Sequence, residues 1–218
     1  MPPGSTERSS SGPAERQGGN RMNTQAIEMI EPEAAAGFAA EIVTPDTAAE
    51  ASELLVGIAR WLRGNGSRQW SGLLDGEDSH GLDEAVRRGE AILFRDGMDG
   101  PGREKGRPAG LVLLLRQPGA WDRELWGEQG HEPYVYLHRL AVARAYAGSG
   151  LGRAILRWAR EQAVHPGKKA IRLDCIAGNP KLEALYASAG YSRLGTSPNG
   201  FCLFEQALPE AQERRPSR

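Results

Sequence analysis

The sequence contains few cysteines, few aromatic residues and no long apolar run. Its two cysteines, Cys175 and Cys202, both lie in expected strands, so we expect buried, reduced thiols rather than a disulfide or a metal pair. No apolar stretch approaches the length of a membrane span, and the N-terminus lacks the apolar region of a signal peptide. We therefore expect a cytoplasmic protein that has no membrane partner.

The chain also lacks an excess of positive or negative charge. The chain carries 27 basic and 28 acidic side chains, a net charge of −1, and no long block of one sign. A surface that binds nucleic acid or an anionic membrane needs clustered positive charge. The composition therefore gives no support for a nucleic-acid partner.

The distribution of apolar residues predicts one domain with two tails. Residues 1–25 are rich in Ser, Gly, Pro, Glu, Arg and Gln and are expected to be disordered. The domain is expected to span residues 39–206, with a weakly helical approach segment at 26–38 and a flexible tail at 207–218. With 39% hydrophobic residues, the chain can bury one substantial core.

Hydrophobic periodicity predicts an alternation of strands and helices within this domain. The expected strands span 41–44, 90–95, 108–117, 134–142, 170–175, 191–196 and 200–206. The expected helices begin at Pro45-Asp46-Thr47, at Leu82, at Gly150 (to residue 165) and at Asn179, and residues 118–133 are expected to form a loop.

The most informative segment is the glycine-rich stretch Gly148-Ser149-Gly150-Leu151-Gly152, which lies between a strand and an amphipathic helix. Alternate glycines let the backbone approach a ligand, and the helix directs unpaired N–H groups into the same space, which suits a phosphate or pyrophosphate. The segment lacks the Gly-Lys-Ser/Thr ending of a P-loop. Its G-x-G-x-G spacing also differs from the dinucleotide fingerprint G-x-G-x-x-G.

This stretch resembles motif A of the GNAT superfamily of N-acetyltransferases, which reads strand, Q/R-x-x-G-x-G/A, helix. Gly150 and Gly152 match its last two positions, whereas Ala147 stands where Gln or Arg is usual; Arg144 and Arg153 are candidates for the missing charge. A second segment, NPKLEALYASAGY at 179–191, resembles the family's N-x-x-A/L-x-x-x-Y-x-x-x-G-F/Y segment. The resemblance covers 134–206 well and 39–117 in outline.

The resemblance implies an α/β (α+β) GNAT acyl-CoA N-acyltransferase fold. Its mixed, mostly antiparallel sheet would have six or seven strands, splayed between the fourth and fifth, with four flanking helices. It also implies an enzyme that moves an acetyl group from acetyl-CoA to a primary amine of a small molecule, by direct attack in a ternary complex, without a metal, as a monomer or homodimer. Two alternatives stay open: a protein or peptide N-acetyltransferase, and a non-catalytic acyl-CoA-binding domain. The absence of Gln or Arg at Ala147 favours the non-catalytic domain, and the presence of Tyr186 disfavours it.

The resemblance also assigns roles to individual residues. A bulge in the strand before the loop would free backbone groups to hold the pantetheine arm, and the loop would hold the pyrophosphate. The coenzyme contacts would come from Leu140, Ala141, Val142, Ala147, Gly148, Ser149, Gly150, Leu151, Gly152, Arg153, Asn179 and Tyr186. Tyr186 aligns with the family's general acid, and Asn179 is also expected to cap its helix.

The general base and the acceptor pocket are less defined. An amine is mostly protonated at neutral pH, so a group must take its proton. Three candidates stay open: Glu132 in the loop before the strand, His138 within it, and Asp174 on the next strand. Trp70, Tyr134 and Tyr136 are expected to line the acceptor pocket, because aromatic rings orient apolar or cationic groups.

Overall fold

The computed structural model describes residues 26–35, 37–77, 81–97 and 106–210. The expected disorder of 1–25 and most of the expected C-terminal tail therefore lie outside the described residues. Among the described residues, none of the helices has an apolar stretch long enough to cross a membrane.

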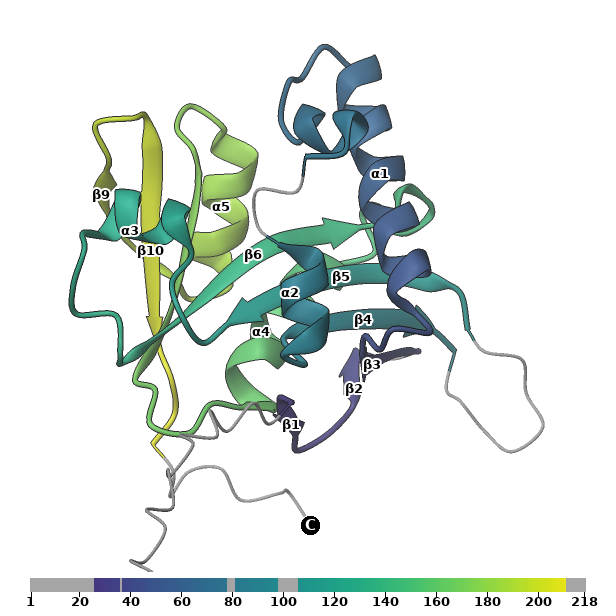
Figure 1. Cartoon of the computed structure of the whole chain (residues 1–218), viewed down its shortest axis with the longest axis horizontal. Helices are drawn as coiled ribbons and strands as arrows, with labels where there is room; N and C mark the ends of the chain where they lie inside the picture. Colours follow the sequence, from purple (N-terminus) through teal and green to yellow (C-terminus); the bar gives the residue numbers. More distant parts are fainter. Residues whose placement is uncertain (1–25, 36, 78–80, 98–105, 211–218) are drawn as a thin grey trace, which may run out of the picture.

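The described residues form one large mixed sheet of eight strands, with the order β2-β3-β4-β5-β6-β8-β10-β9 (Figure 1). Every neighbouring pair is antiparallel except β6 and β8, which run parallel. The strands are β2 (Glu33–Ala35), β3 (Phe38–Ile42), β4 (Ala91–Asp96), β5 (Pro108–Leu115), β6 (Tyr134–Val142), β8 (Ala170–Ile176), β9 (Ser192–Thr196) and β10 (Phe201–Ala207). This mixed, mostly antiparallel sheet confirms the expected fold class.

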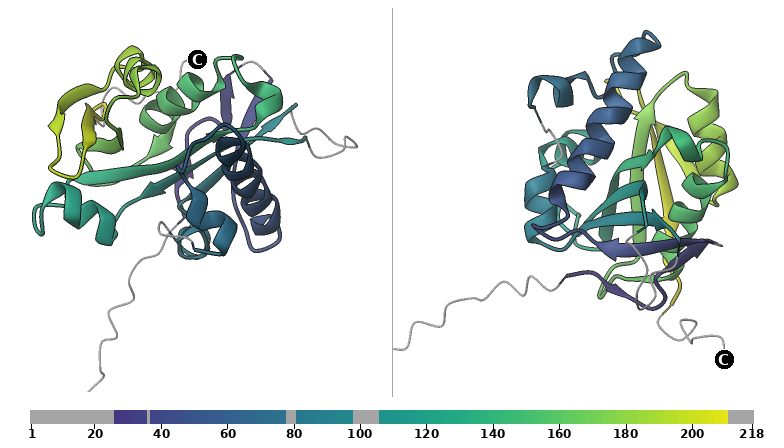
Figure 2. Two further views of the ribbon diagram at one scale, coloured as in Figure 1. Left: turned by 90° about the horizontal axis from the view of Figure 1, so that it is seen from above. Right: turned by 90° about the vertical axis from the view of Figure 1, so that its right-hand side faces the viewer.

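Helices cover both faces of the sheet (Figure 2). Helices α1 (Ala48–Gly64) and α2 (Leu82–Arg87), with the short 3-10 helix η1 (Ser71–Asp75), lie on one face, and α4 (Leu151–Glu161) and α5 (Pro180–Ser188) lie on the other. Each face has its own core. Leu54, Leu93 and Leu113 belong to the core under α1, and Val112, Ile155 and Trp158 to the core under α4. Alternating side chains of the central strands feed both cores, which is why these strands read as continuous apolar runs.

Gly110 in β5 permits the close approach of α4. A Cβ at this position would lie 2.8 Å from Cδ1 of Ile155 and 3.1 Å from the carbonyl oxygen of Ala141. The helix that follows the glycine-rich loop is therefore held tightly against the sheet, which fixes where its N-terminus lies.

Four expectations for local structure were wrong. The segment 26–38 is not helical: it forms β1 (Glu28–Met29), β2 and the start of β3, which itself spans 38–42 rather than 41–44. The helix expected to reach residue 165 ends at Glu161, because Ala163–Val164 (β7) pair with β1 instead. The expected loop 118–133 contains a helix, α3 (Ala120–Trp126). With β2 and α3 added, the large sheet has eight strands and the described residues form five α-helices.

Candidate active site

The sheet is split between β6 and β8. These two strands pair only from Tyr134 to Tyr136, opposite Ala170 to Arg172, and then separate. Beyond Tyr136, none of the described strands pairs with the edge of β6 that faces β8. Figure 1 shows the same divergence between β5–β6 and β10. The splay expected between the fourth and fifth of the expected strands, 134–142 and 170–175, is confirmed.

A β-bulge interrupts β6 just beyond the start of this split. Leu113 pairs with His138 and Leu111 with Ala141, so Val112 alone opposes Arg139 and Leu140. Arg139 has a φ of 53°, in the left-handed region that residues other than glycine rarely occupy. The bulge was an expectation from the family resemblance. It leaves Leu140 and Val142 packed toward the α4 core and Ala141 toward the α1 core.

The glycine loop lies directly before α4, after the short 3-10 helix η2 (Arg144–Tyr146) that follows β6. Residues 147–150 are exposed, and Gly148 and Gly150 have φ values of 81° and 85°. A Cβ at either glycine would meet nothing within 4 Å, so the space in front of the loop is open. Among the described residues, no acceptor is hydrogen-bonded to the backbone amides of Gly148, Gly150 or Gly152. These amides are available to an anion.

The two candidate cations near the loop are placed differently. The Arg144 guanidinium lies 3.8 Å from the centre of the Trp61 ring in α1, so it stacks on the opposite helix. Arg153 is exposed in the first turn of α4 and forms no ion pair with a described residue. A cation in the first turn of a helix opposes the helix dipole. The position of Arg153 is therefore unfavourable for helix stability and favourable for binding an anion.

The loop is anchored from the side of β4. The hydroxyl of Tyr146 donates to the Asp96 carboxylate, and this hydrogen bond holds the pKa of Asp96 below its usual range. The Tyr146 ring also packs edge-on against Phe38, with centroids 5.5 Å apart. These contacts fix the chain directly before Ala147.

Two of the three candidate bases meet where β6 and β8 separate. His138 and Asp174 lie two residues beyond the last paired residues of their strands, and His138 is close enough to affect the pKa of Asp174 electrostatically. His138 is only 6% exposed and its Nε2 is 2.9 Å from Oδ1 of Asp122. Burial raises the pKa of Asp174 above the usual range of an aspartate, against the opposing effects of His138 and of a hydrogen bond from Trp121.

Glu132, the third candidate, lies elsewhere. It is exposed before the start of β6, and its backbone carbonyl accepts a hydrogen bond from Lys168 at 2.9 Å. It precedes Tyr134, the first residue of β6, and four strand residues, roughly 13 Å, separate Tyr134 from His138. It lines a charged groove of about 1090 Å³ between α2 and the loop after α3, together with Arg88 and Arg123. The structure does not bring Glu132 to the split.

The sequence analysis missed the contribution of α3. Trp121 Nε1 donates a hydrogen bond to Oδ1 of Asp174 at 3.2 Å, and the Asp122 carboxylate is hydrogen-bonded to His138. The sequence did contain an N-terminal capping signal for this helix. Gly119 is an acceptable N-cap, and Asp122, three residues later, accepts its backbone N–H at 2.8 Å.

Tyr186 lies on α5, which covers the face of the sheet opposite α3 (Figure 2). It is 6% exposed on α5, and burial raises its pKa, so the phenol keeps its proton. No hydrogen bond joins its hydroxyl to a described residue. The hydroxyl is not one of the fully enclosed oxygens that lack a partner, a group that does include the hydroxyl of Tyr191. Asn179 begins the same helix and accepts the backbone N–H of Leu182 at 3.2 Å, which confirms the expected cap.

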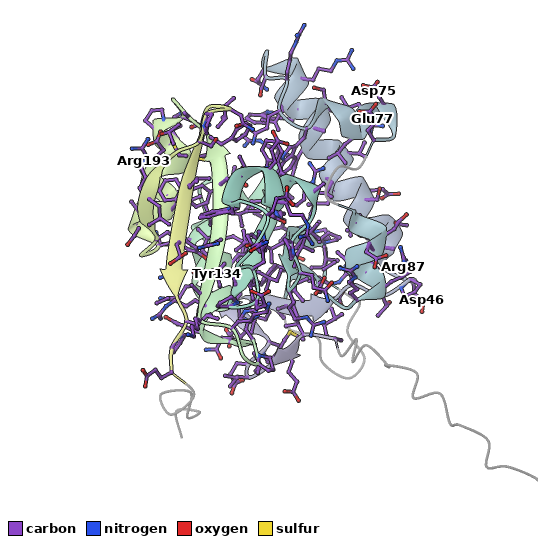
Figure 3. All side chains as sticks on the ribbon, turned by 60° about the vertical axis from the view of Figure 1, so that its left-hand side comes forward. Asp46, Asp75, Glu77, Arg87, Tyr134 and Arg193 are labelled. Atoms are coloured by element: carbon purple, nitrogen blue, oxygen red, sulfur yellow. The ribbon has the colours of Figure 1, made fainter. Side chains whose placement is uncertain are left out.

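The three aromatic candidates for the acceptor pocket are dispersed. Trp70, at the start of η1, lies under the Arg139 guanidinium of the bulge, 5.4 Å from its ring centre. Tyr136 is 1% exposed and its hydroxyl is hydrogen-bonded to His131, so its contacts are internal. Tyr134 stacks on Arg172 at 3.2 Å, and Figure 3 shows it well separated from Asp75 and Glu77 near η1. Trp70 and Tyr134 therefore do not lie side by side.

The described residues contain no cluster of three or more His, Cys, Asp or Glu side chains able to hold a metal ion. The two cysteines lie opposite each other on β8 and β10 and are buried as free thiols.

Comparisons with known proteins agree with this architecture. Residues 77–191, more than half of the chain, match the Acetyltransferase (GNAT) family. The uncharacterized N-acetyltransferase YesJ of Bacillus subtilis is 42% identical over 172 residues, which cover 79% of this chain and 91% of that protein.

Solved structures show the same fold. A GNAT-family acetyltransferase from Listeria monocytogenes matches with a TM-score of 0.61 and 30% identity, covering 78% of this chain and 95% of that one. The aminoglycoside acetyltransferase AAC(6')-Ib, in complex with coenzyme A, matches with a TM-score of 0.54 and 20% identity, covering 83% and 99%. The split sheet, the bulged strand, the glycine loop and these relatives together show that the chain belongs to the GNAT family of acetyltransferases.

Proposed function

We propose that this N-acetyltransferase moves the acetyl group of acetyl-CoA to a primary amine of a small molecule, directly, within a ternary complex. The observation that carries the proposal is the arrangement of titratable groups about the split. His138 and Asp174 lie on the α3 face, and Tyr186 lies on the α5 face. A base and an acid thus flank the gap from opposite sides.

The donor side supports acetyl-CoA. The unpaired amides of Gly148, Gly150 and Gly152, with Arg153 beside them, suit a pyrophosphate even though Ala147 supplies no polar side chain. The free edge of β6 beyond Tyr136 suits the amide groups of a pantetheine arm, which would pair with it as another strand does. The structural relative AAC(6')-Ib has been crystallised with coenzyme A, which agrees with this assignment.

The chemistry follows from the two faces. The amine, deprotonated by His138 or Asp174, attacks the thioester carbonyl carbon, and the carbon–sulfur bond breaks as the new carbon–nitrogen bond forms. The thiolate that leaves takes the Tyr186 proton. The raised pKa of Asp174 makes it a stronger base than an exposed aspartate, and the raised pKa of Tyr186 keeps its proton available until the thiolate appears.

The burial of both cysteines favours direct transfer of the acetyl group over an acetyl-cysteine intermediate. Burial raises the pKa of Cys175 to about 12, so it remains a thiol at neutral pH. Cys202 is fully enclosed in the core. A buried thiol is a poor nucleophile, so neither side chain suits an acetyl-cysteine intermediate.

The acceptor side supports an amine. Asp174 places a carboxylate at the α3 face of the split, and the Trp121 indole donates a hydrogen bond to it. A carboxylate and an indole together attract a protonated amine. AAC(6')-Ib, which shares the fold, has been crystallised with kanamycin, an aminoglycoside. This supports a small molecule as the acceptor class.

Coenzyme A release, measured with acetyl-CoA and a panel of small amines and of peptides, tests the proposal. Turnover with a small amine, with initial-rate lines that intersect when both substrates are varied, is expected. Turnover only with peptides would show that the acceptor is a peptide or protein rather than a small molecule. Parallel lines would contradict the ternary complex and indicate an acetyl-enzyme.

A further inference from the structure

Helix α3 inserts a buried carboxylate beside His138. Asp122 is 1% exposed; its Oδ1 lies 2.9 Å from Nε2 of His138, and its Oδ2 accepts the backbone N–H of Gly119 at 2.8 Å. Both carboxylate oxygens are therefore engaged. The carboxylate cannot rotate without breaking one of these bonds.

Other contacts of α3 hold this carboxylate in place. The Trp121 ring packs edge-on against Phe201 of β10, 4.8 Å between centroids, while its N–H reaches Asp174. On the next turn, Glu124 accepts a hydrogen bond from Asn199 in the β9–β10 turn. The helix thus bridges β6 and the β8–β10 layer on one face of the split.

We infer that Asp122 is a positioning residue that selects the imidazole tautomer of His138 needed for proton transfer. A carboxylate only accepts hydrogen bonds, so Nε2 of His138 carries the proton and donates to Asp122. In the neutral ring, Nδ1 is then the accepting nitrogen. This inference rests on the proposed function, in which His138 and Asp174 are the groups that take the proton of the amine.

The decisive variant is Asp122→Asn. The amide keeps nearly the same shape, and its oxygen still accepts the N–H of Gly119, which directs the NH₂ group toward His138. Nε2 must then accept, and the proton moves to Nδ1. We expect kcat to fall about 100-fold or more, because general-base catalysis contributes factors of about 10² to 10⁴, whereas the KM for acetyl-CoA stays within about twofold because the glycine loop is untouched.

Nitrogen-15 NMR of the imidazole rings provides a readout that a merely structural role would not move. The His138 signals are assigned by their loss in His138→Gln. The wild-type protein is expected to show Nε2–H, and Asp122→Asn to show Nδ1–H. The matched control is Glu124→Gln, on the exposed side of the same helix, which keeps its acceptor and is expected to behave as wild type.

The outcomes separate this inference from the function on which it rests. A wild-type His138 that carries its proton on Nδ1, or on both nitrogens, at the assay pH overturns the inference, and this measurement does not depend on whether a variant folds. Unchanged kcat in a folded Asp122→Asn also overturns it. Full activity of both His138→Gln and Asp174→Asn would instead refute the proposed base, whatever the tautomer.

Discussion

Replacing Tyr186 with phenylalanine removes one oxygen from the α5 face of the split and leaves the ring in place. The ring packs against Phe204 at 5.3 Å and Tyr191 at 6.4 Å between centroids, and these contacts do not involve the hydroxyl. Because no hydrogen bond to a described residue is lost, the folded state is expected to keep its stability to within about 1 kcal/mol.

The expected loss is in turnover. Without the phenol, the departing thiolate must take its proton from water, and general-acid catalysis contributes factors of about 10² to 10⁴. We therefore expect the kcat of Tyr186→Phe to fall at least about 100-fold, measured by coenzyme A release. The dissociation constant of acetyl-CoA, measured by calorimetry, is expected to stay within about threefold, because the loop amides and Arg153 are unchanged.

Tyr191→Phe is the matched control, since it makes the same substitution on a neighbouring ring in the same core. The Tyr191 hydroxyl is buried with no hydrogen-bond partner among the described residues, so its removal is expected to leave kcat unchanged and to raise stability by up to about 1 kcal/mol. Equal kcat in wild type and Tyr186→Phe, or equal losses in the two variants, would refute the assignment of Tyr186 as the acid.

Three further predictions concern the base, the loop and the acceptor side. Burial raises the pKa of Asp174, so its ionisation above that pKa costs folding free energy, about 1.4 kcal/mol for each change of one in pKa. Asp174→Asn should therefore melt at a higher temperature than wild type near pH 8, with the difference vanishing near pH 3; a constant difference would contradict the buried-acid account. Gly150→Ala places a Cβ at a φ of 85° and is expected to cost about 1 kcal/mol in chemical denaturation, without a clash; no loss of stability would show that the left-handed backbone is not maintained. Trp70→Ala removes the stacking partner of Arg139 and should raise the KM for the amine severalfold while sparing acetyl-CoA affinity; the opposite pattern would place Trp70 on the donor side.

The sequence predicts best where local and tertiary signals agree. The bounds of β6 are those expected, because its run of apolar and aromatic residues ends at Val142. Gly148 and Gly150, which precede the next helix, adopt positive φ. Asn179 caps its helix because its side chain reaches an amide only three residues away. These features depend on neighbours in the chain.

Features that depend on distant pairing were not predictable. Ala163–Val164 extend the amphipathic pattern of α4 in sequence but form a strand, because Glu28–Met29 lie beside them in space. Likewise, only the folded chain shows that Trp121 and Asp122 meet Asp174 and His138, 53 and 16 residues away. Of the candidate bases, Glu132 was indistinguishable from the others in sequence, since the difference lies in where β6 and β8 separate, and this depends on long-range pairing.

Calorimetric titration of acetyl-CoA into the wild-type protein and Arg153→Glu tests the central claim, that the glycine loop holds the acyl donor. The account predicts one binding site per chain, with affinity at least about tenfold weaker in the charge-reversed variant, because a charge-assisted contact to phosphate contributes roughly 1.5–3 kcal/mol. Absence of binding heat at several temperatures, or equal affinity in the two proteins, would contradict it.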